Sequence, residues 1–193
     1  MTTSASAPPT RDVAAHLLAT AGRLFAQRGF AAVGVGPIVK ASGVGKATLY
    51  KHFPAKTDLI VAWLKVQEAQ VLARAAAWEG ESGTPPLDQL RGFFRGLAAF
   101  VGSPDCFGCP FQLAVAEFPD EESTPHRAAS THKAAMLFRF RRHCRAGGLT
   151  DPESSAQQLL LVMEGALASS RTWPGKNPGR DVARAADAIL AAG

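Results

Sequence analysis

The chain has 193 residues, 47% of them apolar, and a formal net charge of +5, so it can bury a sizeable core. No apolar run approaches the roughly 20 residues of a membrane-spanning helix, and "MTTSASAPPT" lacks the charged start and apolar middle of a signal peptide. Three cysteines, an odd number, favour a reducing compartment over a disulfide framework. We therefore expect a cytoplasmic protein with a short disordered leader over residues 1–10.

Apolar residues recur at spacings of three and four through most of the chain, which predicts amphipathic helices. In the N-terminal part we expect helices from Arg11 to Gly29, in "PIVKA", in "KATLYKHF" and from Lys56 to about Trp78. Pro37 suits the first turn of the second helix, where its missing N–H costs nothing. Together with the tight turn "SGVG", these segments predict a helix-turn-helix arrangement.

Five more helices are expected further along, over about residues 87–101, 110–118, 126–145, 152–170 and 181–192. Asp151 followed by Pro152 is a favourable start for the fourth of them. Neither the alternation typical of strands nor an internal repeat is present. The sequence therefore predicts an all-α fold of about nine helices, with a helix-turn-helix domain at residues 11–57 and a larger helical domain at residues 58–193.

The excess of positive charge lies entirely in the first third of the chain. Residues 1–60 hold seven lysines and arginines against two acidic residues, whereas residues 61–193 hold fourteen of each sign. This distribution is typical of a protein whose N-terminal part meets a polyanion while the rest does not.

The stretches "LFAQRGF" and "ASGVGKATLYKHFPAK", with the apolar helix that follows them, resemble the DNA-binding domain of the TetR family of bacterial transcriptional regulators. The resemblance runs from Arg11 to about Leu64. It implies a homodimer that binds a double-stranded DNA operator and regulates transcription, with no catalytic residues, cofactor or metal. Repression is expected, and activation stays open from the sequence.

A helix in the major groove needs short or polar side chains at its leading end and phosphate donors around it. We expect Lys46 to contact a base or phosphate, and Thr48 and Tyr50 to donate hydroxyl hydrogen bonds to phosphates. Leu49 and Phe53 are expected to face inward. The expected DNA contacts are Lys46, Ala47, Thr48, Tyr50, Lys51, His52 and Lys56, the last at a helix N-terminus that attracts phosphate.

Two helix starts depart from the pattern of the family. Gly34 to Pro37 stand where relatives usually place a Ser or Thr cap and polar residues, and Gly45 replaces the more usual Ser before the third helix. A side-chain cap at such a position is worth a few tenths of a kcal/mol over glycine. We therefore expect DNA affinity to depend more on Lys46, Lys51 and Lys56.

The resemblance also implies that the region after the fourth helix binds a small effector and that the last two long helices form a dimer. Leu160, Met163 and Leu167 lie on one face of a helix and are the expected dimer contacts, although such a stripe also fits an ordinary core. The many phenylalanines suit a hydrophobic effector. Expected ligand or sensor residues are Phe94, Cys109, Phe111 and Glu117, of which Glu117 also fits a plain surface acid.

Cys106 and Cys109 form a Cys-x-x-Cys pair with three possible interpretations. A thioredoxin-like site would need a βαβ unit, which the pattern lacks. A zinc site would need four ligands, for which Cys106, Cys109, His143 and Cys144 are the candidates. A thiol-redox or metal-binding protein is thus the alternative function.

The third interpretation concerns Cys109 alone. It precedes Pro110 at a helix start, where the helix dipole favours a thiolate. The stretch "GCPFQLAVAEF" resembles a subgroup of TetR-type regulators that includes relatives of the NemR and LmrA types, and some members of the first type sense electrophiles through a cysteine at this place. Cys109 is therefore either a reactive sensor or a buried structural thiol.

Overall fold

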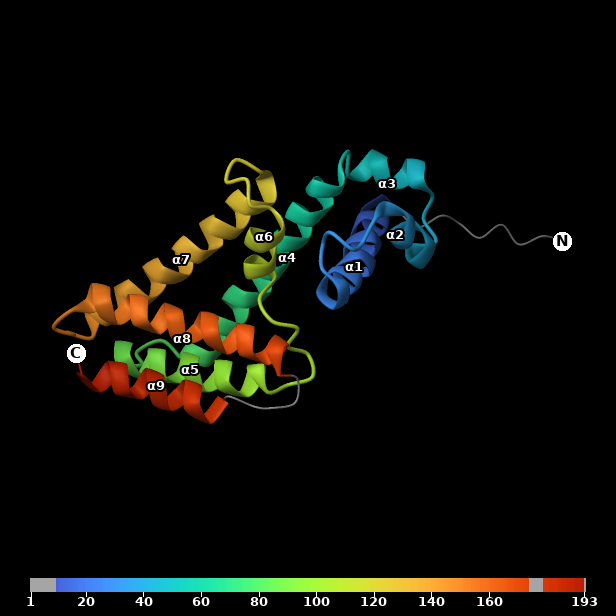
Figure 1. The fold of residues 1–193 in the computed structure, drawn as a ribbon. Helices are drawn as coiled ribbons and strands as arrows, with labels where there is room; N and C mark the ends of the chain where they lie inside the picture. Colours follow the sequence, from blue (N-terminus) through green and yellow to red (C-terminus); the bar gives the residue numbers. More distant parts are fainter. Residues whose placement is uncertain (1–9, 174–178, 193) are drawn as a thin grey trace.

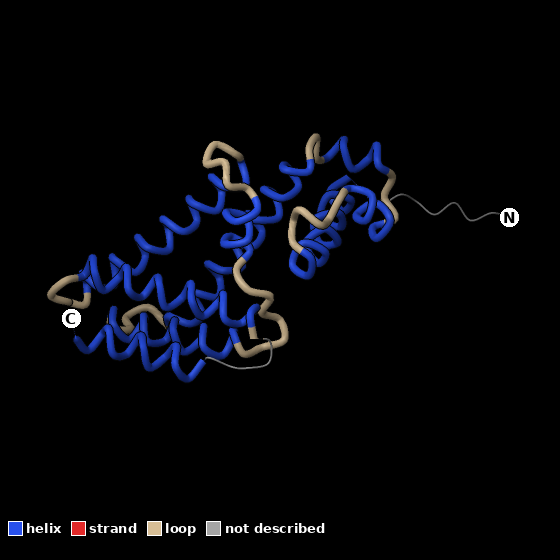
Figure 2. Tube along the Cα trace, in the orientation of Figure 1, coloured by secondary structure: helices blue, strands red, loops and turns tan. Residues whose placement is uncertain are grey.

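The structure is a computed structural model that describes residues 10–173 and 179–192, and over these ranges it contains nine α-helices and no strand. Figures 1 and 2 show helices joined by short loops. The prediction of an all-α fold is confirmed. The helices are α1 (Thr10–Arg28), α2 (Val35–Ser42), α3 (Lys46–His52), α4 (Lys56–Glu79), α5 (Pro86–Val101), α6 (Pro110–Glu117), α7 (Thr124–Ala146), α8 (Pro152–Thr172) and α9 (Gly179–Ala192).

Most helix ends lie where the sequence placed them. Gly29 ends α1 with φ of 85°, a left-handed conformation that suits glycine. Asp151 caps α8 by accepting a hydrogen bond from the Ser154 backbone N–H at 3.0 Å. The predicted leader falls almost wholly on residues 1–9, which lie outside the described residues, as do residues 174–178 of the predicted loop before α9.

Three helices, α2, α7 and α9, start two residues earlier than expected, and in the first two a proline lies near the start. Helix α2 begins at Val35, which places Pro37 third rather than first, and α7 begins at Thr124, ahead of Pro125. Both prolines still lie in the first turn, where backbone N–H groups have no partner within the helix. The sequence pattern was therefore right about the first turn and wrong about its first residue.

The helices form two lobes along the long helix α4 (Figure 1). Helices α1, α2 and α3 form a compact lobe at one end, and α5, α8 and α9 stack at the other. The N-terminal core contains Leu17, Phe25, Ile38 and Leu49, each with no exposed surface. The same core includes Leu59 to Leu64 of α4, so it continues across the boundary expected after residue 57.

A second core lies between α5, α7, α8 and α9, around Phe93, Phe94 and Phe140. The rings of Phe93 and Phe140 meet edge to face at 5.2 Å between centroids. No helix among the described residues is long and apolar enough to cross a membrane. The two cores meet at Val71 of α4 and Leu167 of α8, which pack against both.

The short helix α6 joins the lobes directly. The side chain of Glu117, the last residue of α6, accepts a hydrogen bond from the backbone N–H of Ala31 in the loop after α1. The ring centroid of Phe118, just after α6, lies 6.1 Å from that of Phe30, which is in the same loop as Ala31. The first residue of α6 adjoins Cys109, so this helix connects the cysteine region to the N-terminal lobe.

Candidate DNA-binding surface and effector cavity

Helix α3 presents an exposed polar face. Leu49 is fully buried and Phe53 is 8% exposed, which confirms that both face inward. Tyr50 is 40% exposed, and the Lys46 ammonium lies 5.9 Å from the centre of its ring. The exposed side chains of α3 are Lys46, Ala47, Thr48, Tyr50 and Lys51, and His52 is half-buried. Six of the seven expected DNA contacts therefore come from one short helix.

The seventh expected contact, Lys56, lies elsewhere. Its ammonium donates a hydrogen bond to the Phe30 backbone carbonyl at 2.5 Å, and the side chain is half-buried. Burial lowers the pKa of Lys56 from its usual value, an effect that the nearby carboxylate of Glu117 opposes. Sequence reasoning placed Lys56 on the DNA surface because it begins a helix, but its side chain points into the contact between the lobes.

The missing caps are visible at both helix starts. Gly34 before α2 and Gly45 before α3 make no side-chain cap hydrogen bond.

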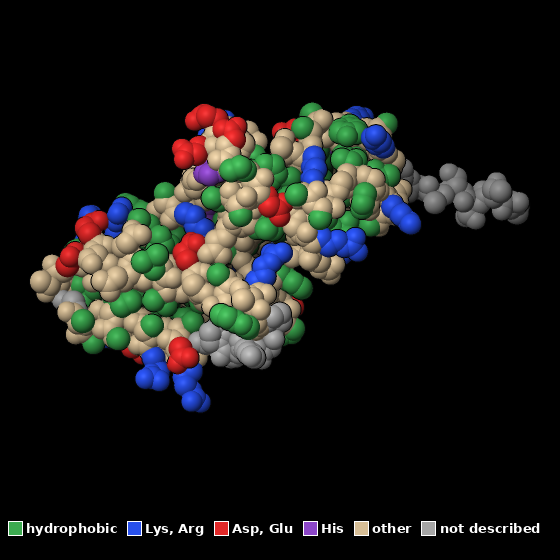
Figure 3. All heavy atoms as spheres, in the orientation of Figure 1, with side chains coloured by type: hydrophobic (Ala, Val, Ile, Leu, Met, Phe, Trp, Pro, Cys, Tyr) green, Lys and Arg blue, Asp and Glu red, His purple; other side chains and the backbone are tan. Residues whose placement is uncertain are grey.

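Lys and Arg side chains are spread over the lobe of α1 to α3, whereas acidic side chains gather on the loop between α6 and α7 (Figure 3). The surface around α3 therefore carries the positive charge that phosphate contacts need.

A cavity of about 280 Å³ lies between α4, α6, α7 and α8 and the loop before α6. Its apolar wall includes Trp63, Phe100, Phe107, Phe111 and Met163. Its polar lining includes Arg74, Cys109, His132, Lys133 and Arg171. An apolar enclosure with few polar groups is the usual form of a small-molecule site.

Trp63 separates this cavity from the N-terminal core. Its ring makes edge-to-face contacts with Phe25 at 5.8 Å and Phe30 at 5.7 Å. The same side chain also lines a wider groove between α1 and α4. Because Trp63 belongs to both, a change in the shape of the cavity also changes the packing of the core that supports α3.

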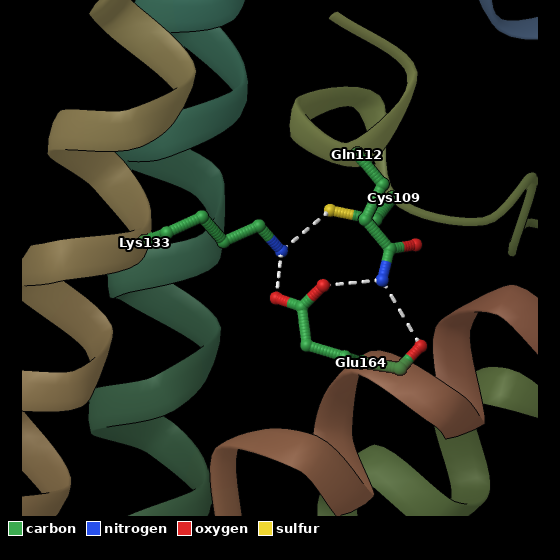
Figure 4. A network of polar contacts seen from close by, with 4 residues as sticks. All are labelled: Cys109, Gln112, Lys133 and Glu164. Atoms are coloured by element: carbon green, nitrogen blue, oxygen red, sulfur yellow. Dashed lines mark hydrogen bonds and ion pairs between the residues drawn. The ribbon is translucent and has the colours of Figure 1, made fainter. Parts of the chain in front are cut away.

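Cys109 belongs to a polar network at the start of α6 (Figure 4). The Lys133 ammonium, on α7, donates to the Cys109 sulfur at 3.3 Å and to a carboxylate oxygen of Glu164 on α8. The Gln112 side-chain amide donates to the other oxygen of Glu164 and to its backbone carbonyl, the latter at 3.1 Å. This network holds α6, α7 and α8 together beside the cavity.

The three cysteines are free thiols in different surroundings. Cys106 lies 3.3 Å from the Ser170 hydroxyl, sulfur to oxygen, and Cys109 is 7% exposed at the cavity. Cys144 is fully buried, and burial raises its pKa to about 11. No cluster of three or more His, Cys, Asp or Glu that could hold a metal occurs among the described residues, so the candidate zinc ligands do not come together there.

Two expected ligand residues do not line the cavity. Phe94 is 1% exposed and packs against Phe93 in the second core. Glu117 lies at the far end of α6, beside Ala31. Of the expected ligand or sensor residues, Phe111 and Cys109 are the two that the structure places at the cavity. Apolar spacing of three and four places a residue on the inner face of a helix, but does not say which interior space its side chain meets.

The expected dimer residues are mostly internal. Met163 is 4% exposed and lines the cavity, as does the half-buried Leu167, while Leu160 packs against the second core. On the same helix, Leu161 is 61% exposed. The exposed face of α8 is therefore offset by one residue from the predicted stripe of Leu160, Met163 and Leu167.

Sequence reasoning also missed four charged residues near the cavity. Lys133 and Glu164 pair across 31 positions of sequence, and Arg74 and Arg171 line the cavity from α4 and α8. None belongs to a recognisable motif. The one available signal was the presence of single charged residues in helices with an otherwise apolar inner face.

Comparison with known proteins agrees with this architecture. The family described as bacterial regulatory proteins, tetR family, matches residues 17–63. The transcriptional regulator LmrA of Bacillus subtilis is 29% identical over 172 residues, covering 86% of this chain and 90% of its own. A solved TetR-family regulator from Streptomyces coelicolor is 30% identical with a TM-score of 0.88, and the match covers 94% of this chain and 95% of that protein.

These relatives are transcriptional regulators rather than enzymes, and their similarity extends over both lobes. One assignment follows from three findings: an exposed polar helix in a basic lobe, a cavity beside the core of that lobe, and a relative with 30% identity over nearly the full chain. The chain belongs to the TetR family of bacterial transcriptional regulators, which bind DNA through a helix-turn-helix.

Proposed function

We propose that this protein is a cytoplasmic, homodimeric repressor that leaves its operator when a small hydrophobic effector fills the cavity or when Cys109 is modified. The single observation that carries the proposal is the position of the cavity. Its wall includes Trp63, which also packs in the core that supports α3. Helix α6 gives a second connection, from Cys109 at one end to Glu117 and Ala31 at the other.

The effector acts by differential binding. A ligand that fits the cavity better in the DNA-free arrangement shifts the population toward that arrangement. Because α6 is short and held at both ends, displacement of the Cys109 end changes the contact of Glu117 with the N-terminal lobe. Two recognition helices that move apart no longer match two half-sites about 34 Å apart.

For the dimer we propose the outer faces of α8 and α9. The exposed face of α8 carries Leu161, Gly165 and Ala168, a large apolar side chain beside two small residues. A Cβ added at Gly165 would meet no atom within 4 Å. A symmetric partner helix can therefore approach this face closely.

Binding to DNA from the region upstream of the gene tests the proposal directly. A footprint on that DNA with two symmetric protected half-sites is the expected result. The alternative, a thiol-redox protein, would instead show disulfide-reductase turnover and no salt-sensitive DNA binding. Transcription from the same DNA, measured with and without the protein, separates repression from activation.

Replacing Lys46 by alanine is expected to weaken operator binding and to lower its salt dependence. Lys46 is exposed at the first residue of α3, so the change removes a phosphate or base contact without disturbing the core. The slope of log affinity against log salt should fall by about one for each subunit bound. Fluorescence anisotropy of a labelled operator at several salt concentrations measures both quantities.

The matched control for this experiment is Arg95→Ala on α5, which removes an equal charge from an exposed position in the other lobe, outside the proposed dimer interface. Its salt slope should equal that of the unmodified protein. An unchanged slope for Lys46→Ala would show that Lys46 does not contact DNA.

Mild treatment with a thiol-reactive electrophile is expected to modify Cys109 before Cys144. Cys109 lines the cavity, where a small reagent can reach its sulfur, and the Lys133 ammonium lies 3.3 Å from that sulfur. Cys144 is fully buried with a raised pKa of about 11. Peptide mass mapping over time measures the two rates, and Lys133→Met should slow modification of Cys109. Equal rates for Cys109 and Cys144 would end the sensor hypothesis.

A further inference from the structure

The charged residues at the cavity differ in whether they already have partners. Lys133 pairs with Glu164, whose second oxygen accepts from Gln112, so this group of three is internally balanced (Figure 4). Arg74 and Arg171 also line the cavity, and neither makes an ion pair with a carboxylate of the described residues. Asp105 is the one acidic lining residue, and it is exposed. The lining therefore carries a positive excess.

Arg74 is held in place without its charge being neutralised. Its guanidinium carbon lies 4.7 Å from the centre of the Phe100 ring, a cation–π contact that fixes its orientation. Burial lowers the pKa of Arg74 from its ordinary value, which reflects partial loss of water around the cation. An arginine in this state still has free N–H donors arranged in a planar fork.

Arg171, an exposed residue of α8, lines the cavity and contacts the loop before α6. Its stem packs against Gly108, where an added Cβ would lie 3.3 Å from the Arg171 Cβ, and its guanidinium donates to the Phe107 backbone carbonyl at 3.4 Å. That long hydrogen bond uses one of five donors. The remaining donors stay available to a ligand.

The rest of the wall supplies flat apolar surface. Trp63, Phe100, Phe107 and Phe111 contribute aromatic rings, and the ring of His132 stacks on Phe111 at 3.7 Å between centroids. Burial lowers the pKa of His132, so the imidazole is favoured in its neutral form and adds no charge. A planar ring system fits between such faces.

We infer that the effector of this cavity is a planar aromatic acid, whose rings lie against the aromatic wall and whose carboxylate is bound by Arg74 and Arg171. The inference rests on the proposed function, because it names the ligand class for the same cavity. A carboxylate matches the guanidinium fork with two parallel hydrogen bonds. A cationic ligand of the same shape would instead add a charge beside Arg74, Arg171 and Lys133.

Isothermal titration calorimetry with three probes of one ring system tests the inference: naphthoate, neutral naphthamide and cationic naphthylmethylammonium. Naphthoate should bind about tenfold or more tighter than naphthamide, since each hydrogen bond to a charged group contributes substantially to affinity. The ammonium probe should bind weakest. Arg74→Met and Arg171→Met should each lower naphthoate affinity about tenfold and leave naphthamide affinity unchanged.

Unchanged naphthamide binding also shows that each variant keeps a folded cavity. Arg95→Met, at an exposed position of α5 outside the cavity, is the matched control and should bind all three probes as the unmodified protein does. Equal affinity for naphthoate and naphthamide, tighter binding of the ammonium probe, or no saturable binding of naphthoate would each overturn the inference. So would an equal loss of both probes in Arg74→Met.

The outcome is independent of the test of the proposed function, because these titrations contain no DNA. Operator binding without naphthoate binding would support the proposed regulator and refute the aromatic acid as its effector. Naphthoate binding without operator binding would show the reverse.

Discussion

Replacing Arg139 by methionine is expected to lower the free energy of unfolding by about 3–5 kcal/mol, because it leaves a buried carboxylate without its cation. Glu79, the last residue of α4, is 6% exposed, and both of its oxygens accept hydrogen bonds from the Arg139 guanidinium on α7. His143 is the next nearest cation, with its Nε2 3.6 Å from a Glu79 oxygen. Burial lowers the pKa of His143, so near neutral pH it does not replace the arginine.

The destabilisation should become smaller as the pH falls. As the pH falls, protonation of His143 supplies a cation whose Nε2 lies 3.6 Å from the unpaired Glu79 carboxylate. Urea unfolding followed by circular dichroism at neutral and acidic pH measures the effect. A second change, Glu79→Leu in the Arg139→Met background, should recover most of the lost stability, because an apolar pair needs no compensating charge.

Arg145→Met is the matched control. Arg145 also lies on α7 and pairs with a carboxylate, that of Glu153, but its side chain is 62% exposed. Exposed pairs contribute at most about 1 kcal/mol, so this variant should unfold at nearly the same urea concentration as the unmodified protein. Similar losses in both arginine variants would show that burial of Glu79 does not govern the energy of its ion pair.

Replacing Gly22 by alanine is expected to lower the free energy of unfolding by about 1–3 kcal/mol and to weaken operator binding. A Cβ at Gly22, on α1, would lie 2.2 Å from the Trp63 indole nitrogen and 2.7 Å from a ring carbon. Trp63 is 7% exposed and fixed by Phe25 and Phe30, so its ring has little room to move. Helix α1 must therefore shift away from α4, and α3 packs on α1.

Gly36→Ala controls for the change from glycine to alanine itself. A Cβ at Gly36, on α2, would meet no atom within 4 Å, so this variant should be as stable as the unmodified protein or slightly more stable. Combining Gly22→Ala with Trp63→Phe should cost less than the sum of the two single changes, since the smaller ring removes the clash. Strict additivity in thermal unfolding would contradict a direct contact between the two positions.

The helices could be predicted because their causes are local. Apolar spacing, Pro152 after a capping Asp151, and Gly29 at a helix end act within a few residues of one another. Their first residues could not be placed in the same way, as Val35 and Thr124 show, since a proline fits more than one position of a first turn.

The candidate site was predictable where it lies on one element. Lys46, Thr48, Tyr50 and Lys51 share the exposed face of α3, and the motif around them is continuous in sequence. Lys56 shows the limit of the same reasoning. Its place at a helix start was clear from the sequence, whereas the direction of its side chain depends on Phe30 and Glu117, which the fold brings from two other segments.

By itself, the amino-acid sequence determined the helical class, the basic N-terminal lobe and the recognition helix, because periodicity, caps and charge are properties of short continuous segments. Only the tertiary structure decided the cavity and its chemistry. Arg74 and Arg171 lie nearly a hundred positions apart, and the pairing of Lys133 with Glu164 leaves these two arginines as the cavity's unpaired cations among the described residues. Which charges remain unpaired depends on the packing of four helices, and no local pattern contains that information.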